Sequence, residues 1–161
     1  MSNPIIKIEV RDYGTITAEL YPDKAPKTVE NFLSLIDRNF FDGLIFHRVI
    51  SGFMIQGGGY TEDGNYKNAP SIKGEFSSNG FKTNDLKHTR GVLSMARTMV
   101  KDSASSQFFI MHENAPHLDG DYAAFGKVTD GIDIVDKIAT TPTDYQDCPR
   151  FPVVITSIKR G

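Results

Sequence analysis

Apolar and polar residues alternate with a period of two through residues 6–20, which is the spacing of side chains along a β-strand. Ile6, Ile8 and Val10 share one face of the first run, and the alternation resumes after a turn at residues 12–14. Successive side chains of a strand point to opposite faces of a sheet. The pattern therefore predicts a β-hairpin with one buried face.

Short runs rich in β-branched and aromatic residues recur along the rest of the chain, at residues 44–50, 53–56, 92–96, 107–112, 124–128 and 153–158. A helical period appears in two places, with apolar stripes formed by Val29, Phe32, Leu33 and Ile36 and by Ile132, Ile134, Val135 and Ile138. Two helices among about eight short strands favour a closed sheet or a sandwich. Closure is attractive because it removes unpaired strand edges.

The chain of 161 residues has the usual size of one domain, and no linker or internal repeat divides it, so we expect a single domain over residues 1–161. Lys and Arg number 18 against 20 Asp and Glu, a formal net charge of −2. No block of like charge occurs along the chain. This charge pattern disfavours nucleic acid and anionic membranes as partners.

The single cysteine, Cys148, cannot form an internal disulfide, which fits a reducing compartment. No motif surrounds it, and we expect an unreactive thiol. The opening residues show no basic flank followed by an apolar stretch, and nowhere do about eighteen apolar residues run together. We therefore expect a cytoplasmic protein that does not cross a membrane.

Two motifs invite a ligand-binding interpretation that their spacing disfavours. Residues 57–59 are three glycines after a strand, but no Gly-Lys-Ser/Thr ending or helix follows them, so backbone flexibility is the better interpretation than a phosphate loop. His112 and His117 have Pro116 between them, whereas the helical zinc motif needs a spacing of four residues in an unbroken turn. We expect no metal site.

Ser94 and His88 are the candidate residues of a hydrolase. Ser94 lies in GVLSMA, residues 91–96, which lacks the glycines of a nucleophile elbow, and the sequence places no Asp–His pair beside it. We expect His88 to anchor a loop by hydrogen bonding. A hydrolase that uses Ser94 stays an unsupported alternative.

The strongest local signal is FHRVISGFMIQGG at residues 46–58, two short strands around a Ser-Gly turn with an arginine in an apolar setting. This segment resembles the signature of the cyclophilins, the cyclosporin-binding family of peptidyl-prolyl isomerases. Further blocks extend the resemblance over essentially the whole chain: APKTVENF (25–32), SIKGEF (71–76), RGVLSMA (90–96), SQFFI (106–110), HLDG (117–120) and FGKV (125–128).

The resemblance implies a mainly β fold, an eight-stranded antiparallel closed β-barrel capped by two α-helices, in agreement with the strand count. It also implies a peptidyl-prolyl cis-trans isomerase that rotates X-Pro peptide bonds and assists protein folding. Such a rotation makes and breaks no bond, so it needs no nucleophile, metal or cofactor. The expected partners are proline-containing peptides and unfolded or partly folded proteins. We expect a monomer, because no a/d heptad pattern appears.

Arg48 and Gln56 are the expected catalytic residues. The guanidinium of Arg48 is permanently charged and can donate to a substrate amide, and Gln56 would bond the substrate carbonyl or orient Arg48. A three-residue turn at residues 51–53 would pair Arg48 with Gln56. A two-residue turn would place it opposite Ile55 instead. We predict the three-residue turn.

The remaining site residues follow from the resemblance alone. They are the proline-pocket walls Phe53, Met54, Phe109 and Leu118, the neighbours Ala96, Arg97 and Gln107 that would hold the adjacent peptide unit, and the flanking residues His117 and Tyr122. Many family members carry tryptophan at the position of His117 and histidine at that of Tyr122. Because His117 is smaller and lacks the indole N–H, we expect weakened cyclosporin binding.

A non-catalytic module or holdase that recognises proline-containing segments is the alternative function. Both functions need the pocket. A binder, however, has no need of Arg48 facing Gln56.

Overall fold

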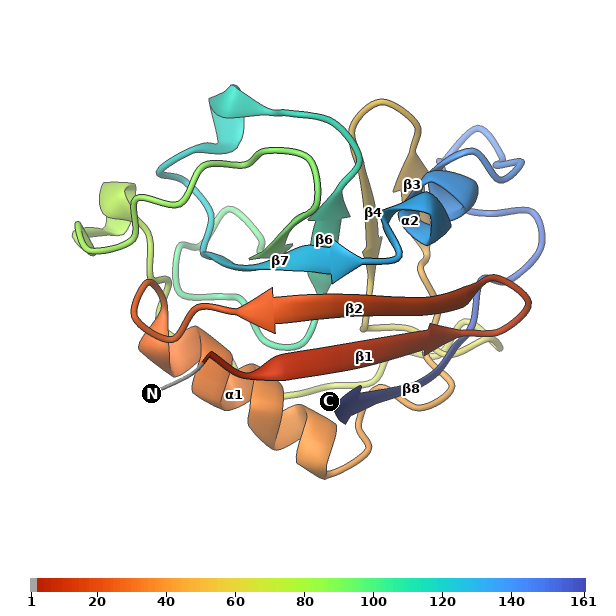
Figure 1. Ribbon diagram of the computed structural model, residues 1–161, viewed down its shortest axis with the longest axis horizontal. Helices are drawn as coiled ribbons and strands as arrows, with labels where there is room; N and C mark the ends of the chain where they lie inside the picture. The colour runs from red at the N-terminus through yellow and green to blue at the C-terminus, as the bar shows by residue number, and fades with distance from the viewer. Residues whose placement is uncertain (1–2) are drawn as a thin grey trace.

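The computed structural model describes residues 3–161; Met1 and Ser2, the first residues of the expected domain and N-terminus, lie outside this range. The chain forms eight strands and two α-helices (Figure 1). The strands are β1 (Ile5–Val10), β2 (Gly14–Leu20), β3 (Arg48–Ile50), β4 (Met54–Gly57), β5 (Val92–Met95), β6 (Phe108–Met111), β7 (Ala124–Asp130) and β8 (Ile155–Arg160). The helices are α1 (Pro26–Asp37) and α2 (Ile132–Ala139), and η1 (Ser77–Asn79) and η2 (Pro116–Leu118) are short 3-10 turns.

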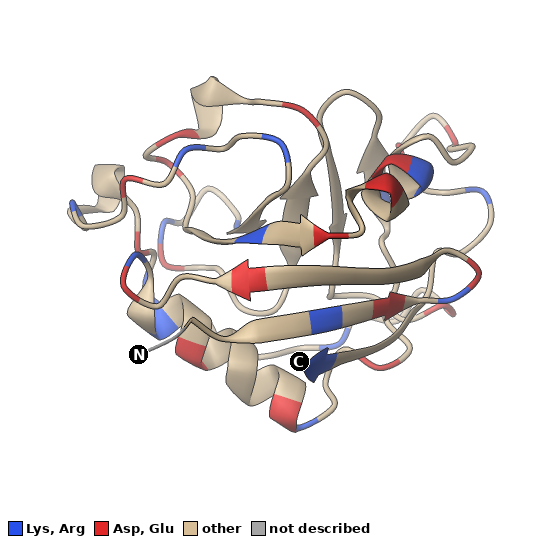
Figure 2. Ribbon diagram, viewed as in Figure 1, with Lys and Arg blue, Asp and Glu red and all other residues tan. Residues whose placement is uncertain are grey.

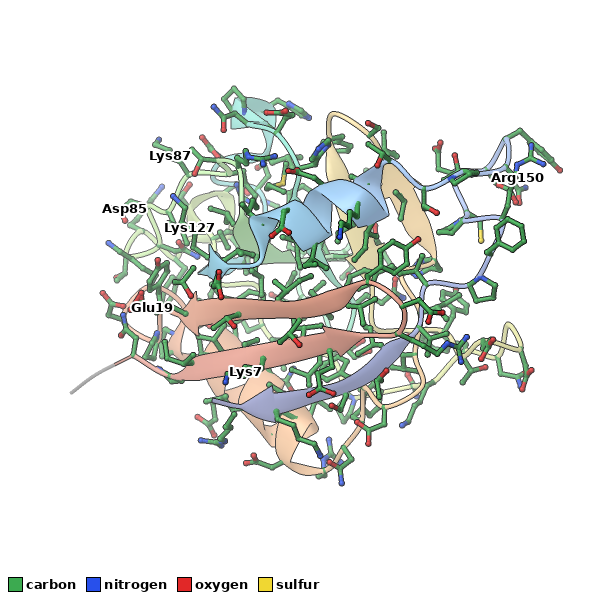
Figure 3. The ribbon with its side chains drawn as sticks, turned by 45° about the vertical axis from the view of Figure 1, so that its right-hand side comes forward. Lys7, Glu19, Asp85, Lys87, Lys127 and Arg150 are labelled. Carbon is green, nitrogen blue, oxygen red and sulfur yellow. The ribbon has the colours of Figure 1, made fainter. Side chains whose placement is uncertain are left out.

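The expected hairpin is confirmed as β1 and β2, which pair antiparallel along their whole length. Ile6 and Ile8 are fully buried, while Lys7 between them is exposed. Lys7 on β1 and Glu19 on β2 stand on the outer face of the sheet (Figure 3). The period of two in the sequence is therefore the division between core and solvent.

All eight strands belong to one antiparallel sheet, with the order β3-β4-β6-β5-β7-β2-β1-β8. The sheet is strongly curved: β1 and β2 cross the front of the molecule, while β3, β4 and β6 lie behind them at a steep angle (Figure 1). Helix α1 packs against β8, and α2 packs against β2 and β4. The mainly β fold with antiparallel strands and two helices is confirmed.

The expectation of a closed barrel is wrong, because β3 and β8 are the two edges of an open half-barrel and no ladder joins them within residues 3–161. The segment before β3 meets the start of β8 through an isolated bridge between Ile45 and Val154 and a few backbone hydrogen bonds, among them the Ile155 N–H to the Leu44 carbonyl at 2.7 Å. The loop before β8 occupies the edge of β3 instead, where the Val49 N–H donates to the Asp147 carbonyl at 2.7 Å. A loop that satisfies an edge strand removes the need for closure.

Both faces of β4, β5 and β6 are buried, and they face two separate apolar clusters. On β6, Phe108 belongs to the main core inside the half-barrel, and its neighbour Phe109 belongs to a second cluster outside it. Phe32 of α1 fills the inside, with ring centroids 5.2 Å from Phe108 and 5.0 Å from Phe125. The outer cluster includes Met54, Phe109 and Leu118, and the partly buried Phe53 and Tyr122 pack against it.

The first turn of α1 is capped by a side chain far away in the sequence. Ala25 at the N-cap offers no side-chain acceptor. The buried carboxylate of Glu75 accepts hydrogen bonds from the Lys27 N–H at 3.2 Å, the Thr28 N–H at 2.6 Å and the Thr28 hydroxyl at 2.7 Å. Helix N-termini leave backbone N–H groups without partners and favour negative charge, so Glu75 ties the long loop before β5 to α1.

Replacing Glu75 by alanine is expected to lower the free energy of unfolding by about 2 kcal/mol, because buried N–H groups lose their acceptor. Urea unfolding followed by circular dichroism measures this. The control is Glu62→Ala, which removes an exposed carboxylate 3.0 Å from Arg11 and should change stability by about 0.5 kcal/mol or less. Equal effects of the two substitutions would contradict the capping role.

Candidate functional site

One row of side chains crosses the outer face of the sheet. Arg48 on β3 is paired with Gln56 on β4, Gln56 with Phe109 on β6, and Phe109 with Ser94 on β5. Neighbouring strands lie about 4.8 Å apart, so residues in register present adjacent side chains on one face. The row places a cation, an amide, an aromatic ring and a hydroxyl side by side.

The hairpin of β3 and β4 sets the start of this row. Its turn holds residues 51–53, and the pairing of Arg48 with Gln56 confirms the predicted three-residue turn. Gly52 has φ of 80°, a left-handed conformation that glycine adopts without strain. Its N–H donates to Nδ1 of His112 at 2.8 Å, so His112 holds the turn.

A hollow of about 150 Å³ lies over the row, and we call it the slot. Its lining consists of Arg48, Phe53, Met54, Gln56, Ala96, Arg97, Phe109, Leu118 and Tyr122. The floor is closely packed, since Met54, Phe109 and Leu118 are buried and the Phe109 and Tyr122 rings meet edge to face at 5.8 Å. The four expected pocket walls, Phe53, Met54, Phe109 and Leu118, all line this one hollow.

The polar side of the slot is a chain of amide and guanidinium groups. Arg48 donates to Oε1 of Gln56 at 3.4 Å, and Gln56 donates from Nε2 to Oε1 of Gln107 at 3.1 Å. A Cβ on Gly59 would lie 2.6 Å from Cγ of Gln107, so only glycine leaves room for this glutamine. Gln56 is thus held from both sides, and the exposed Arg48 is oriented towards the slot.

Gln107 lines a second hollow beside the slot, which we call the side hollow. The two hollows share Gln56, Ala96 and Arg97. The side hollow is completed by Tyr66, Thr98, Ser103, Ser105 and Gln107. Of the expected substrate-binding residues, Gln107 therefore lies next to the slot and does not line it.

Arg97 forms the partition between the slot and the side hollow. Its Nε and one terminal nitrogen donate to the Asp121 carbonyl at 3.0 and 2.7 Å, and the other donates to the Thr98 carbonyl at 2.9 Å. The guanidinium also lies 4.7 Å from the centre of the Tyr122 ring. Arg97 is consequently held in place and supports the Tyr122 wall.

His117 stands outside the slot. Its exposed ring stacks on Phe53 with centroids 5.9 Å apart and an interplanar angle of 29°. It extends the Phe53 wall and does not contribute to the lining of the slot itself. Of the two flanking residues, only Tyr122 lines the slot.

Sequence reasoning missed an Asp–His pair beside Ser94. Nε2 of His88 lies 2.8 Å from Oγ of Ser94, and Nδ1 of His88 lies 3.0 Å from Oδ1 of Asp119. The three residues come from separate segments of the chain, and no spacing rule joins them. The expected role of His88 as a loop anchor is confirmed, because its carbonyl also accepts from the Ala115 N–H at 2.8 Å.

His47 directly precedes β3 and is the one residue within 3–161 with a buried side-chain nitrogen, Nδ1, that has no hydrogen-bond partner. Its ring packs against Tyr60 at 4.7 Å. Burial, with the Arg48 charge nearby, lowers the pKa of His47 to about 4. At neutral pH the ring is therefore uncharged.

The described part of the chain holds no cluster of three metal-ligating side chains. Burial and the nearby Asp144 carboxylate raise the pKa of the Cys148 thiol, which stays protonated at neutral pH.

None of the helices in residues 3–161 has the length and apolar character needed to cross a bilayer. Along the ribbon of Figure 2, the positions of Lys and Arg alternate with those of Asp and Glu.

The fold and the slot define the class of protein, an antiparallel half-barrel with a site on the outer face of its sheet. Residues 5–160 match the family model of the cyclophilin type peptidyl-prolyl cis-trans isomerases. A peptidyl-prolyl cis-trans isomerase of Acinetobacter baylyi is 45% identical and is matched over 99% of this chain and 86% of its own. Peptidyl-prolyl cis-trans isomerase B of Escherichia coli is 42% identical, over 91% of this chain and 94% of its own.

Solved structures agree with these relatives. A cyclophilin type isomerase of Cryptosporidium parvum superposes with a TM-score of 0.84 at 30% identity, covering 99% of this chain and 98% of that one. Its structure in the presence of the dipeptide Ala-Pro gives a TM-score of 0.82. The chain belongs to the cyclophilin-type peptidyl-prolyl cis-trans isomerases, and it is an enzyme that isomerises proline peptide bonds.

Replacing His47 by phenylalanine is expected to raise the free energy of unfolding at pH 7 by about 1 kcal/mol, because it removes a buried nitrogen without a partner. The variant should also resist acid better. The pKa of folded His47 lies below that of the unfolded chain, so stability is full above about pH 6.5 and falls as the pH drops towards 4.

Urea unfolding of both proteins at several pH values tests this prediction. The control is His117→Gln, which alters an exposed ring and should keep the wild-type dependence on pH. A His47→Phe protein that is less stable at neutral pH and loses stability in acid as steeply as wild type would contradict it.

Proposed function

We propose that Arg48 is the catalytic residue of this isomerase and that the slot binds the proline ring of the substrate. An ordinary peptide bond resists rotation by about 18–20 kcal/mol. In the twisted transition state the amide loses its resonance, the prolyl nitrogen becomes pyramidal, and its lone pair accepts a hydrogen bond. Arg48 lines the slot and carries a permanent charge, so it can donate to that nitrogen or to the substrate carbonyl.

The required rate enhancement is within reach of such a site. Uncatalysed X-Pro isomerisation takes tens of seconds, and catalysis in milliseconds requires roughly four decades, or about 5–6 kcal/mol of preferential binding to the twisted amide. A charge-assisted hydrogen bond in a site partly shielded from water supplies much of this. The apolar walls supply more, because a twisted amide is less polar than a planar one.

The remaining residues have supporting roles in this proposal. Gln56 orients Arg48 or bonds the substrate carbonyl, and its contact with Gln107 supports this role. Phe53, Met54, Phe109, Leu118 and Tyr122 surround the proline ring. Gln107, with the backbone at Ala96 and Arg97, holds the adjacent peptide unit along the side hollow.

The observation that carries the proposal is the register of Arg48, Gln56 and Phe109 across three neighbouring strands. It brings the cation and its orienting amide beside an aromatic wall of the slot. A module that only binds proline-containing segments needs the slot and gains nothing from an oriented guanidinium.

Arg48→Ala is expected to reduce kcat/KM by about 100- to 1000-fold, as the loss of one preorganised donor does in other enzymes. Arg48→Lys should lose at least about tenfold, because lysine lacks the rigid fork of donors. Exchange NMR of an Ala-Pro peptide measures both rates. Arg38→Ala, at the end of α1 and outside both hollows, serves as the control.

Equal exchange enhancement by the wild-type and Arg48→Ala proteins would remove Arg48 from catalysis. Binding of the peptide without any enhancement by the wild-type protein would favour a holdase or a binding module. Labelling of Ser94 by a serine-reactive probe would favour a hydrolase, but Ser94 is fully buried.

His117→Trp is expected to strengthen cyclosporin binding by about tenfold or more. The indole would widen the wall that His117 forms on Phe53 and would add an N–H donor. Calorimetric titration of cyclosporin into both proteins measures the change. Unchanged affinity would contradict our expectation that His117, in place of tryptophan, weakens cyclosporin binding.

We further propose that the chain acts as a monomeric single domain in the cytoplasm on unfolded or partly folded proteins. One cysteine with a protonated thiol fits a reducing compartment. Light scattering of the purified protein and its effect on a proline-limited refolding reaction test the two parts of this proposal.

A further inference from the structure

A buried histidine supports the slot from behind. His88 is 1% exposed, and its ring lies between Ser94 on β5 and Asp119 after η2. Serine, histidine and aspartate are hydrogen-bonded here in the same order as in a Ser-His-Asp catalytic triad. Ser94 is fully buried, however, so no acyl substrate reaches its hydroxyl and the network serves another purpose.

The hydrogen bonds define which nitrogen of His88 carries the proton. Oδ1 of Asp119 accepts from the His88 backbone N–H at 2.6 Å and lies 3.0 Å from Nδ1. A carboxylate only accepts, so Nδ1 is the protonated nitrogen. Nε2 is then an acceptor, and the Ser94 hydroxyl donates to it at 2.8 Å. Of these hydrogen bonds, only the one from the Ser94 hydroxyl to Nε2 requires a neutral imidazole, because the bond from Nδ1 to Asp119 is kept when the ring is protonated.

His88 contacts two walls of the slot and is hydrogen-bonded to the residue that follows a third. Its ring stacks on Phe109 with centroids 6.0 Å apart and an interplanar angle of 20°, and meets Tyr122 edge to face at 6.4 Å. Asp119, which holds Nδ1, directly follows the third wall, Leu118. Ser94, which holds Nε2, is the partner of Phe109 in the sheet. The His88 ring is therefore packed against the floor and one side of the slot.

Resting on the proposed binding of proline in the slot, we propose that His88 is a positioning residue, whose neutral ring keeps Phe109, Leu118 and Tyr122 in the arrangement that the reaction needs. Protonation puts a second N–H on the ring, which forces the Ser94 hydroxyl to turn and become an acceptor. It also places a positive charge directly behind Phe109, within an apolar cluster. The activity consequently falls in acid while the chain is still folded.

Few charges face this ring. Burial lowers the pKa of His88, the Asp119 carboxylate opposes the lowering, and His117 adds a small further decrease. Tyr122 faces the ring only through its edge. Within residues 3–161, Asp119 is the carboxylate that favours the protonated ring, and its removal should move the acid fall of activity to lower pH.

The experiment is a profile of kcat and KM for an Ala-Pro peptide between about pH 5 and pH 8, with circular dichroism at each pH to verify folding. The variants are His88→Gln, which has no titrating ring, and Asp119→Asn, which keeps the acceptor oxygen and removes the charge. Asp121→Asn removes an exposed carboxylate from the same loop and is the matched control. His47→Phe removes the other buried histidine and controls for acid effects outside the slot.

We expect the wild-type kcat/KM to fall in acid with a midpoint that matches the NMR titration of the His88 ring. His88→Gln should lose about tenfold at neutral pH and show no acid fall. Asp119→Asn should shift the midpoint by about half a pH unit or more to lower pH. Asp121→Asn and His47→Phe should keep the wild-type midpoint.

An acid fall that persists in His88→Gln, or a midpoint that Asp119→Asn leaves in place, would overturn the positioning role. The same holds if the wild-type profile stays flat until the protein unfolds. Failure of the proposed catalytic function is a separate outcome, because the wild-type protein would then fail to accelerate exchange at every pH.

Discussion

The register between β3, β4, β6 and β5 is the constraint on which the site depends. Because the turn between β3 and β4 holds three residues, Arg48 faces Gln56, and the same row continues through Phe109 to Ser94. A shift of one residue in β4 would turn Gln56 into the core and bring Ile55 to the surface. Cation, orienting amide and aromatic wall would then no longer meet on one face.

The stiffness of this row comes from apolar packing on both faces of the same strands. Behind the sheet, Phe32 and Phe108 fill the half-barrel. On the outer face, Met54, Phe109 and Leu118 belong to a second buried apolar cluster. Polar groups then complete the site from two sides, Gln107 beside the row and His88 behind it. Catalysis by preferential binding depends on such preorganisation, since no covalent step is available.

Much of this architecture was predictable from local patterns. The period of two indicated the β1–β2 hairpin, the two helical stripes correspond to α1 and α2, and the turn at residues 51–53 set the partners of Arg48. The prediction of a closed barrel was wrong, because the carbonyl of a loop residue, Asp147, accepts a hydrogen bond from the edge strand β3. The roles of the slot residues in catalysis stay proposals, and their meeting in one hollow depends on segments that no local pattern connects.

The amino-acid sequence by itself determined the strands, the helices and the register of the β3–β4 hairpin, because these follow from side-chain periodicity and turn length over a few residues. It also determined the family, since its motifs occur in order along the whole chain. Only the tertiary structure decided that Glu75 caps α1, that Arg97 is held by carbonyl groups, and that His88 joins Ser94 to Asp119. These contacts join residues from separate segments, and such pairs become neighbours only when the curved sheet brings distant loops together.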